Sequence, residues 1–214
     1  MPTTKTPKKR IHLAFFETAC TGNHMCAGQW KTEGDNSRSK DRLEYWINIA
    51  KLADEGKVSC IFFADSYAGK DVLGHEMRSI FASGANVAQM DPLVIISAMA
   101  AVTKSVSFGV TCSTTYVKPY ITARAYSTLD LLTEGRVAWN IVTSYSQSSA
   151  DAFGEDSVLP HDERYAMANE YMDVVYKLWE RSWDDGAQVW DLEREMVYDS
   201  TKIKKIEHDG NHLL

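Results

Sequence analysis

The sequence predicts an α/β protein built around a parallel β-sheet. Four apolar runs are rich in β-branched and aromatic residues and mostly do not alternate with polar residues, which is typical of strands covered on both faces. Helical patterns lie between these runs, so that strand and helix alternate four times along the chain. With 214 residues and 44% hydrophobic content, the chain is long enough to bury a large core.

The predicted strands are short and follow one another at intervals that leave room for a helix between them. They cover residues 11–16 (IHLAFF), 58–64 (VSCIFFA), 106–112 (VSFGVTC) and 137–142 (VAWNIV). Parallel strands need such long crossover connections, and these connections are right-handed.

The predicted helices are marked by capping residues and by apolar residues at helical spacing. The first helix covers residues 42–55, with Asp41 as a candidate cap and Gly56 as its stop. The second begins with Asp91 as N-cap and Pro92 at the first helical position, and runs to residue 103. Two more helices are predicted, one from Pro119 up to Gly135 and one over residues 161–183.

Two architectures fit this order of elements, an open doubly wound sheet and a closed (β/α)8 barrel. A barrel needs eight units and typically about 250 residues, so on that reading the chain holds about the first four units. A fifth strand could begin at Leu213-Leu214. A flavodoxin-like open sheet would be complete at this length, but its phosphate loop is poorly imitated by ETACTGNH after the first run.

The composition excludes several classes of protein. The 23 basic and 29 acidic residues give a net charge of −6, which argues against nucleic acid as a partner. The longest strongly apolar run, residues 93–102, is about half of the ~20 residues that a membrane helix needs, and the N-terminus lacks the apolar core of a secretion signal. We therefore expect a cytoplasmic protein without membrane contact, with residues 1–9 as a flexible tail.

The cysteines and histidines predict neither a disulfide framework nor a metal site. Cys60 and Cys112 lie inside apolar runs, where a reduced thiol is usual, and neither Cys20 nor Cys26 forms a CxxC pair. The six histidines form no HExxH motif and no pair at metal-ligand spacing. The motifs GxGxxG, GxxxxGK[ST] and GxSxG are also absent, which argues against a classical dinucleotide fold, a P-loop and an α/β-hydrolase.

Polar side chains gather where the predicted strands end, which is the edge that binds ligands in both architectures. The strand-end residues are Glu17, Thr18 and Cys20, then Asp65 and Ser66, then Thr111 and Ser113 to Thr115, and finally Asn140, Thr143 and Ser144. Serines at such positions often cap helices. Asn140 lies inside a run that should be buried, so its amide needs either a ligand or a structural partner.

His161 and Tyr165 are four residues apart near the start of the fourth predicted helix. They therefore share one face of the helix, close to its positive end, where an anion or an electron-rich group is favoured.

Several long motifs resemble one known family. The segments FFADSY, VTCSTTYVKPYITARAYSTLDLLTEGRVAWNIVTS, HDERYAMANEYMDVVYKLWERSWDD and KIEHDGNHL look like the nitrilotriacetate, dibenzothiophene-sulfone and pristinamycin-type monooxygenases. These enzymes belong to the bacterial-luciferase-like superfamily of flavin-dependent monooxygenases. The resemblance implies a (β/α)8 barrel of TIM type, of which residues 10–214 form the N-terminal half of the monooxygenase domain.

The resemblance also implies the chemistry and the site. Such enzymes take reduced FMN from a separate reductase and use O2 to oxygenate a small organic substrate. By motif, the residues implied at the FMN site are Asp65, Thr111, Asn140, His161 and Tyr165, with His161 as the candidate catalytic residue near the reactive flavin edge. Two expectations follow from a half-length barrel: impaired activity or a non-catalytic flavin-binding role, and self-association through exposed surfaces.

Overall fold

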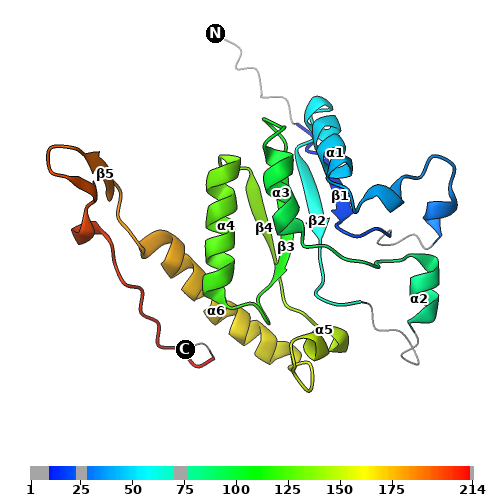
Figure 1. Ribbon diagram of the computed structural model, residues 1–214. Helices are drawn as coiled ribbons and strands as arrows, with labels where there is room; N and C mark the ends of the chain where they lie inside the picture. Colours follow the sequence, from blue (N-terminus) through cyan, green and yellow to red (C-terminus); the bar gives the residue numbers. More distant parts are fainter. Residues whose placement is uncertain (1–9, 23–27, 70–76, 213–214) are drawn as a thin grey trace, which may run out of the picture.

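The computed structural model describes residues 10–22, 28–69 and 77–212, and its centre is a four-stranded parallel sheet (Figure 1). The strands lie in the order β1-β2-β3-β4. They are β1 (Ala14–Thr18), β2 (Cys60–Ala64), β3 (Ser107–Ser113) and β4 (Val137–Val142). The strand predicted at 137–142 is confirmed at both ends, and those at 58–64 and 106–112 are confirmed with shifts of one or two residues.

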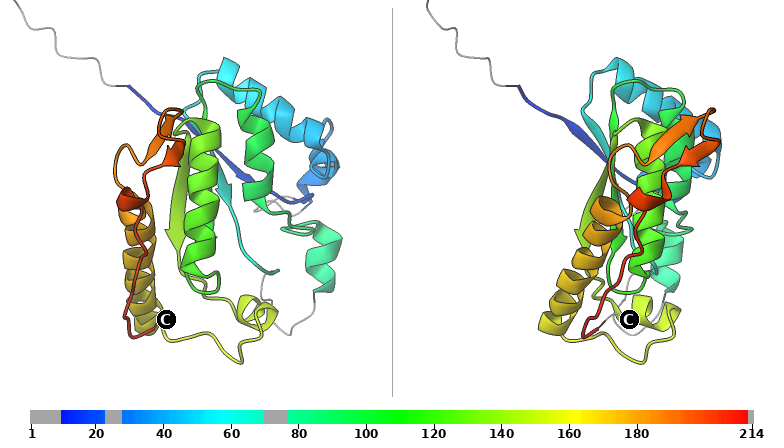
Figure 2. Two further views of the ribbon diagram at one scale, coloured as in Figure 1. Left: turned by 60° about the vertical axis from the view of Figure 1, so that its left-hand side comes forward. Right: turned by 90° about the vertical axis from the view of Figure 1, so that its left-hand side faces the viewer.

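Helices cover one face of this sheet (Figure 2). The covering helices are α1 (Leu43–Glu55), α3 (Pro92–Ala100) and α4 (Pro119–Thr133), while α6 (His161–Arg181) packs against α4. Smaller elements complete the described chain: α2 (Arg78–Ser83), α5 (Gln147–Ala152), the antiparallel pair β5 (Gln188–Asp191) and β6 (Met196–Tyr198), and 3-10 turns at Gln29–Lys31, Ser37–Ser39 and Ser200–Lys202.

This arrangement decides between the two predicted architectures. A doubly wound sheet reverses its strand order at a switch point and carries helices on both faces. Here the strand order follows the sequence, and all three crossover helices lie on the same side of the sheet (Figures 1 and 2). The described chain is therefore an α/β unit of the barrel type, corresponding to a partial barrel, and the flavodoxin-like alternative is wrong.

The core lies between the sheet and its helices because alternate strand residues point toward them. Ile61 and Phe63 of β2 and Phe108 and Val110 of β3 have no exposed surface and pack in one cluster with residues of α1, α3 and α4. Gly109 faces the opposite side, where a Cβ atom would come within 3.1 Å of the Phe62 ring. A side chain at this position would therefore crowd the Phe62 ring.

The first strand differs from its prediction at both ends. It was expected at residues 11–16, but β1 begins at Ala14 because its pairing partner β2 begins at Cys60. Ile11 and Leu13, which made the run look like a strand, are exposed. The strand continues through Glu17 and Thr18, so these two residues belong to the paired strand and not to its exit.

The helix predictions hold with small corrections. Asp91 accepts a hydrogen bond from the Leu93 N–H and Pro92 follows it, as predicted for the N-terminus of α3. Asp41 was predicted to cap α1, but the N-cap is Arg42 and its side chain makes no capping hydrogen bond. Helix α3 ends at Ala100, three residues early, and α6 ends at Arg181, two residues before the predicted end.

Other expectations concern the cysteines, membrane-spanning helices and metal sites. Cys20, Cys60 and Cys112 are free thiols, while Cys26, the tail at residues 1–9 and Leu213-Leu214 lie outside the described residues. In the described ranges, no helix is long and apolar enough to cross a membrane. The same ranges contain no group of three His, Cys, Asp or Glu side chains that could hold a metal ion.

Candidate functional site

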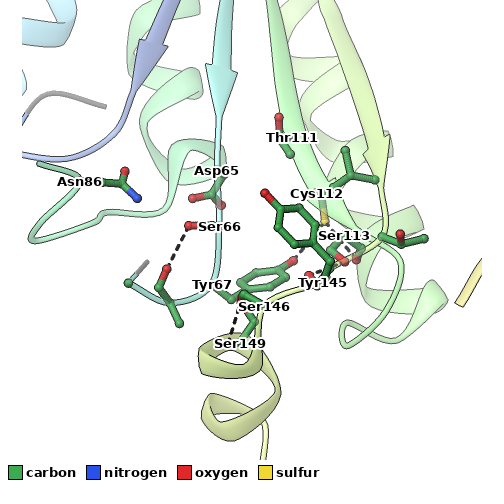
Figure 3. A pocket seen from close by; sticks show the side chains of 15 residues that line it. Asp65, Ser66, Tyr67, Asn86, Thr111, Cys112, Ser113, Tyr145, Ser146 and Ser149 are labelled. Atoms are coloured by element: carbon green, nitrogen blue, oxygen red, sulfur yellow. Dashed lines mark hydrogen bonds between the residues drawn. The ribbon is translucent and has the colours of Figure 1, made fainter. Parts of the chain in front are cut away.

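A cavity of about 520 Å³ opens at the carboxyl end of the sheet (Figure 3). It is formed by the segments that follow β2, β3 and β4, the place where α/β proteins bind ligands. Hydroxyl groups dominate its wall. The lining residues are Asp65, Ser66, Tyr67, Ala68, Gly69, Asn86, Thr111, Cys112, Ser113, Val142, Thr143, Ser144, Tyr145, Ser146 and Ser149.

Among the described residues that line the cavity, Asp65 is the one with a carboxyl group, and burial makes this carboxyl a weaker acid. It directly follows β2, and burial raises its pKa to about 7. The Ser66 N–H lowers this pKa by a smaller amount, and the nearby carboxylate of Asp91 raises it. At neutral pH the Asp65 carboxyl can therefore either donate or accept a hydrogen bond.

Thr111 and Asn140 are neighbours in the sheet, which explains how the amide inside β4 is accommodated. They are register partners on β3 and β4, and Asn140 Nδ2 donates to Thr111 Oγ1 at 2.9 Å. Thr111 also lines the cavity, whereas Asn140 is not among the lining residues. The structure thus gives Asn140 a structural partner, which orients the threonine hydroxyl at the cavity wall.

The serine hydroxyls of the wall hold one another in place. Ser144 Oγ donates to Ser113 Oγ at 2.8 Å, which ties the exit of β4 to the exit of β3. Ser146 caps α5 by accepting a hydrogen bond from the Ser149 N–H. Ser148 Oγ donates to the Gly69 carbonyl at 2.7 Å, across 79 positions of sequence. These bonds fix the shape of the wall before any ligand arrives.

Tyr67, one of the lining residues, belongs to an aromatic cluster. The Tyr67 ring meets the Phe153 ring edge-on at 5.1 Å, and Phe153 stacks on Tyr116 at 4.7 Å. The Tyr67 hydroxyl lies 3.4 Å from Cys112 Sγ. This aromatic cluster was not predicted from the sequence, although Tyr67 lies only two residues after the predicted site residue Asp65.

His161 and Tyr165 lie at the start of α6, which is at the same end of the sheet as the cavity (Figure 1). Their rings are 4.7 Å apart, as expected for one helical turn. Neither residue is part of the cavity wall, and both are exposed. His161 Nδ1 lies 2.8 Å from Asp162 Oδ1. The structure therefore places Asp65 and Thr111 in one cavity wall and brings Asn140 into contact with Thr111. It leaves His161 and Tyr165 outside that wall.

Arg164, in the same turn of α6, carries a buried donor that was not predicted from the sequence and lies outside the residues that line the cavity. Its Nη1 donates to the Leu159 carbonyl at 2.7 Å. Its Nε is buried and has no hydrogen-bond partner among the described residues. A buried guanidinium N–H without an acceptor is costly, so this donor is suited to an anionic oxygen.

Comparison with known proteins agrees with this geometry. The family model described as luciferase-like monooxygenase matches residues 23–213. The long-chain alkane monooxygenase of Geobacillus thermodenitrificans is 43% identical over 205 residues, which are 96% of this chain and 46% of the relative. The dimethyl-sulfide monooxygenase of Hyphomicrobium sulfonivorans is 44% identical over 96% of this chain and 42% of the relative. The nitrilotriacetate monooxygenase component A of Aminobacter aminovorans is 34% identical over 96% of this chain and 45% of the relative.

Solved structures give the same result. The crystal structure of the long-chain alkane monooxygenase superposes with a TM-score of 0.92 at 42% identity, over 96% of this chain and 47% of that one. A riboflavin lyase with modified FMN superposes with a TM-score of 0.88 at 32% identity, over 96% of this chain and 45% of that one. The chain spans about half the length of the curated relatives it matches. The resemblance found in the sequence motifs is confirmed, and the chain belongs to the luciferase-like monooxygenase family.

Proposed function

We propose that this chain is part of an FMN-dependent monooxygenase that uses reduced FMN and O2 to oxygenate a small organic substrate. The main support for the proposal is a hydroxyl-rich cavity at the carboxyl end of the partial barrel. The chain that forms it matches the family model over residues 23–213. We propose further that a separate reductase supplies the reduced flavin, since one relative is named component A of a nitrilotriacetate monooxygenase. Neither nucleic acid nor a membrane is proposed as a partner, and the proposed location is the cytoplasm.

The cavity wall fits the ring system of FMN. Its volume of about 520 Å³ lies within the usual range for small-molecule sites. A flavin ring presents both donors and acceptors along its edge. Asp65, with a pKa of about 7, can donate or accept there, and the Thr111 hydroxyl is already oriented by Asn140. Asp65 and Thr111 are therefore the proposed ring-side contacts, and Asn140 acts by orienting the Thr111 hydroxyl.

The start of α6 fits the phosphate of FMN. A helix N-terminus favours a negative charge, and Arg164 adds a buried N–H that no described residue accepts. Tyr165 is one turn along from His161 and can donate its hydroxyl. His161 remains our candidate for hydrogen bonding close to the reacting groups, because an imidazole offers both a donor and an acceptor nitrogen.

The protein's own contribution to the reaction is binding, orientation and exclusion of water. When bound, reduced FMN supplies the activation of O2 and the transfer of one oxygen atom to the substrate. The hydrogen-bonded serines hold the loops after β3 and β4 in a fixed arrangement. The ring contacts of Tyr67 with Phe153, and of Phe153 with Tyr116, hold the Tyr67 side chain in the cavity wall.

A titration with FMN, first oxidised and then anaerobically reduced, tests the proposal. We expect saturable binding, followed by flavin fluorescence and absorbance, that weakens about tenfold or more in Asn140→Ala and in His161→Ala. Asn48→Ala, an exposed position on α1, is the matched control and should bind as the wild type does. Absence of binding by the wild-type chain would contradict the proposal. Binding without oxygenation in the presence of a reductase would favour the alternative, a non-catalytic flavin-binding protein.

A further inference from the structure

Among the described residues that line the candidate cavity, Asn86 has the only amide side chain. It is just 7% exposed, and its amide points toward Asp65 (Figure 3). In the described ranges this amide has no hydrogen-bond partner. An amide that is withdrawn from water without a partner is costly, so its donor and its acceptor are suited to a polar molecule in the cavity.

The hydroxyl groups of the same wall are largely used by the protein itself. Ser66 Oγ donates to the Ala68 carbonyl at 3.0 Å and accepts from Gln89 Nε2 at 3.2 Å. Ser113 and Ser144 are bonded to each other. The buried amide differs from these hydroxyls, because the described part of the chain leaves its polar atoms to a ligand.

The segment of residues 84–90, which carries this amide, is fixed to the exits of two strands. The Met90 N–H donates to the Ala19 carbonyl at 2.6 Å, and Gln89 forms an antiparallel bridge with Cys20. Both contacts tie the segment to the chain that follows β1. The side chain of Gln89 ties it to the exit of β2. These contacts hold the amide in place before a ligand binds.

The backbone of this segment adopts a left-handed conformation at two residues. The φ angle is +55° at Asn86 and +54° at Ala88. This region is unusual for residues other than glycine, although asparagine tolerates it better than most. Such residues persist where surrounding contacts hold them, and they cluster at ligand sites. Glycine adopts the same φ without strain, so Asn86→Gly removes the amide and keeps the backbone.

An amide side chain is complementary to an imide, because it presents an N–H donor and a C=O acceptor side by side in one plane. The ring system of a flavin carries an imide, in which the N3–H group lies between two carbonyl groups. The N3–H can donate to the Asn86 carbonyl while the Asn86 NH2 group donates to one flanking carbonyl. Asp65, toward which the amide points, can donate to the other carbonyl in its protonated form.

We propose that Asn86 binds the imide of the flavin ring through these two hydrogen bonds. The inference rests on the proposed function, because the imide belongs to FMN. Two parallel hydrogen bonds fix the orientation of the ring, which a single hydroxyl cannot do. With the imide at Asn86 and Asp65, the remainder of the ring extends toward Thr111 on β3 (Figure 3).

Titration of the chain with FMN and with N3-methyl-FMN tests this inference. The methyl group replaces the hydrogen of N3–H and leaves the rest of the flavin unchanged. We expect N3-methyl-FMN to bind the wild-type chain at least tenfold more weakly than FMN, because the Asn86 carbonyl loses its donor. Flavin fluorescence measures both dissociation constants. Equal binding of the two flavins would overturn the inference.

Asn86→Gly identifies the residue that recognises the N3–H group. We expect this variant to bind FMN at least tenfold more weakly than the wild type, and to bind the two flavins within twofold of each other. Asn36→Gly is the matched control, since Asn36 is exposed and its side chain makes no capping hydrogen bond. It should keep the wild-type affinity and the preference for FMN. Circular dichroism verifies that both variants fold. A preference for FMN that persists in Asn86→Gly would overturn the assignment to Asn86.

The same titrations separate this inference from the proposed function. A wild-type chain that binds neither flavin would contradict the proposed function and this inference together. A wild-type chain that binds FMN, with Asn86→Gly binding it within twofold, would overturn the inference alone and leave the proposed function standing. A tenfold loss in Asn86→Gly together with lost discrimination between the two flavins would support both.

Discussion

At the residue scale, Asp65 connects the cavity to the stability of the fold. Burial raises its pKa from 3.8 to about 7, which means that the folded state favours the protonated carboxyl. A group whose pKa is higher in the folded protein than in the unfolded chain stabilises the fold at pH values below the pKa of the unfolded chain. For Asp65 the pKa of the unfolded chain is about 4. That contribution is lost as the pH rises from about 4 to about 7, because the unfolded chain releases the proton more readily.

Asp65→Asn should therefore become more stable relative to the wild type as the pH rises. An amide keeps the size of the carboxyl and carries no charge, so the penalty for ionising a buried group disappears. Between pH 4 and pH 8 we expect the difference in free energy of unfolding to change by about 3 kcal/mol in favour of the variant. Urea denaturation at several pH values measures this change. Asp173→Asn, at an exposed position on α6, is the control. If the difference in free energy of unfolding is independent of pH for both variants, the raised pKa of Asp65 does not affect stability as described.

Single residues also mark the limit of what the sequence reveals about the site. Asn140 could be recognised because an amide inside an apolar run needs a partner, but the identity of that partner depends on the register of β3 with β4. Asp65 and Thr111 could be placed at a cavity because they follow or close strands. The burial that raises the pKa of Asp65 comes from segments distant in sequence, so it could not be read from the local motif.

At the scale of the elements, Arg136 holds the opposite end of the sheet together. It follows α4 and precedes β4, and its guanidinium reaches three neighbouring segments. Nη1 donates to Thr103 Oγ1 at 2.9 Å and to the Val106 carbonyl at 3.0 Å, and Nη2 donates to the Ala100 carbonyl at 3.2 Å. Nε donates to the Thr133 carbonyl at 2.9 Å. One planar group thus joins the ends of α3 and α4 to the start of β3.

Arg136→Lys should destabilise the fold without affecting flavin binding. A lysine keeps the charge but cannot reproduce the planar set of donors, so several carbonyls lose their partner. We expect a loss of about 2 kcal/mol in the free energy of unfolding, measured by urea denaturation. Because Arg136 lies at the amino end of the sheet, the affinity for FMN should stay within twofold. Arg181→Lys, at the exposed end of α6, is the control. A change of less than about 0.5 kcal/mol would show that the guanidinium contacts are not needed.

Which elements could be predicted depends on where their stabilising contacts lie. Helix α3 carries its own start signal in Asp91 and Pro92, and β4 is an apolar run apart from Asn140, so both could be located from local sequence. Helix α5 has only six residues, and it is fixed by a Ser148 contact to Gly69 that spans 79 positions. The aromatic group of Tyr67, Phe153 and Tyr116 likewise joins three separate loops. Such contacts are set by tertiary structure and leave no periodic pattern.

At the scale of the whole molecule, the helices of the described residues cover one face of the sheet and leave the other uncovered. On the other face, Phe16 of β1 stacks on Phe62 of β2 at 5.9 Å, and 57% of the Phe16 side chain is exposed. Strands β1 and β4 are the two outer strands of the sheet in the described part of the chain. An apolar sheet face flanked by open strand edges favours association with another polypeptide.

We therefore propose that this chain self-associates through the uncovered face of its sheet. Phe16→Lys places a charge on that face and should weaken association at least fivefold, because a lysine ammonium resists the desolvation that an apolar interface requires. Analytical ultracentrifugation over a range of concentrations measures the change in the dissociation constant. Leu52→Lys, at a 65% exposed position on α1, introduces the same charge on the far side of the helix layer and should leave association unchanged. A wild-type chain that stays monomeric, or equal weakening by both variants, would show that the uncovered face is not the interface.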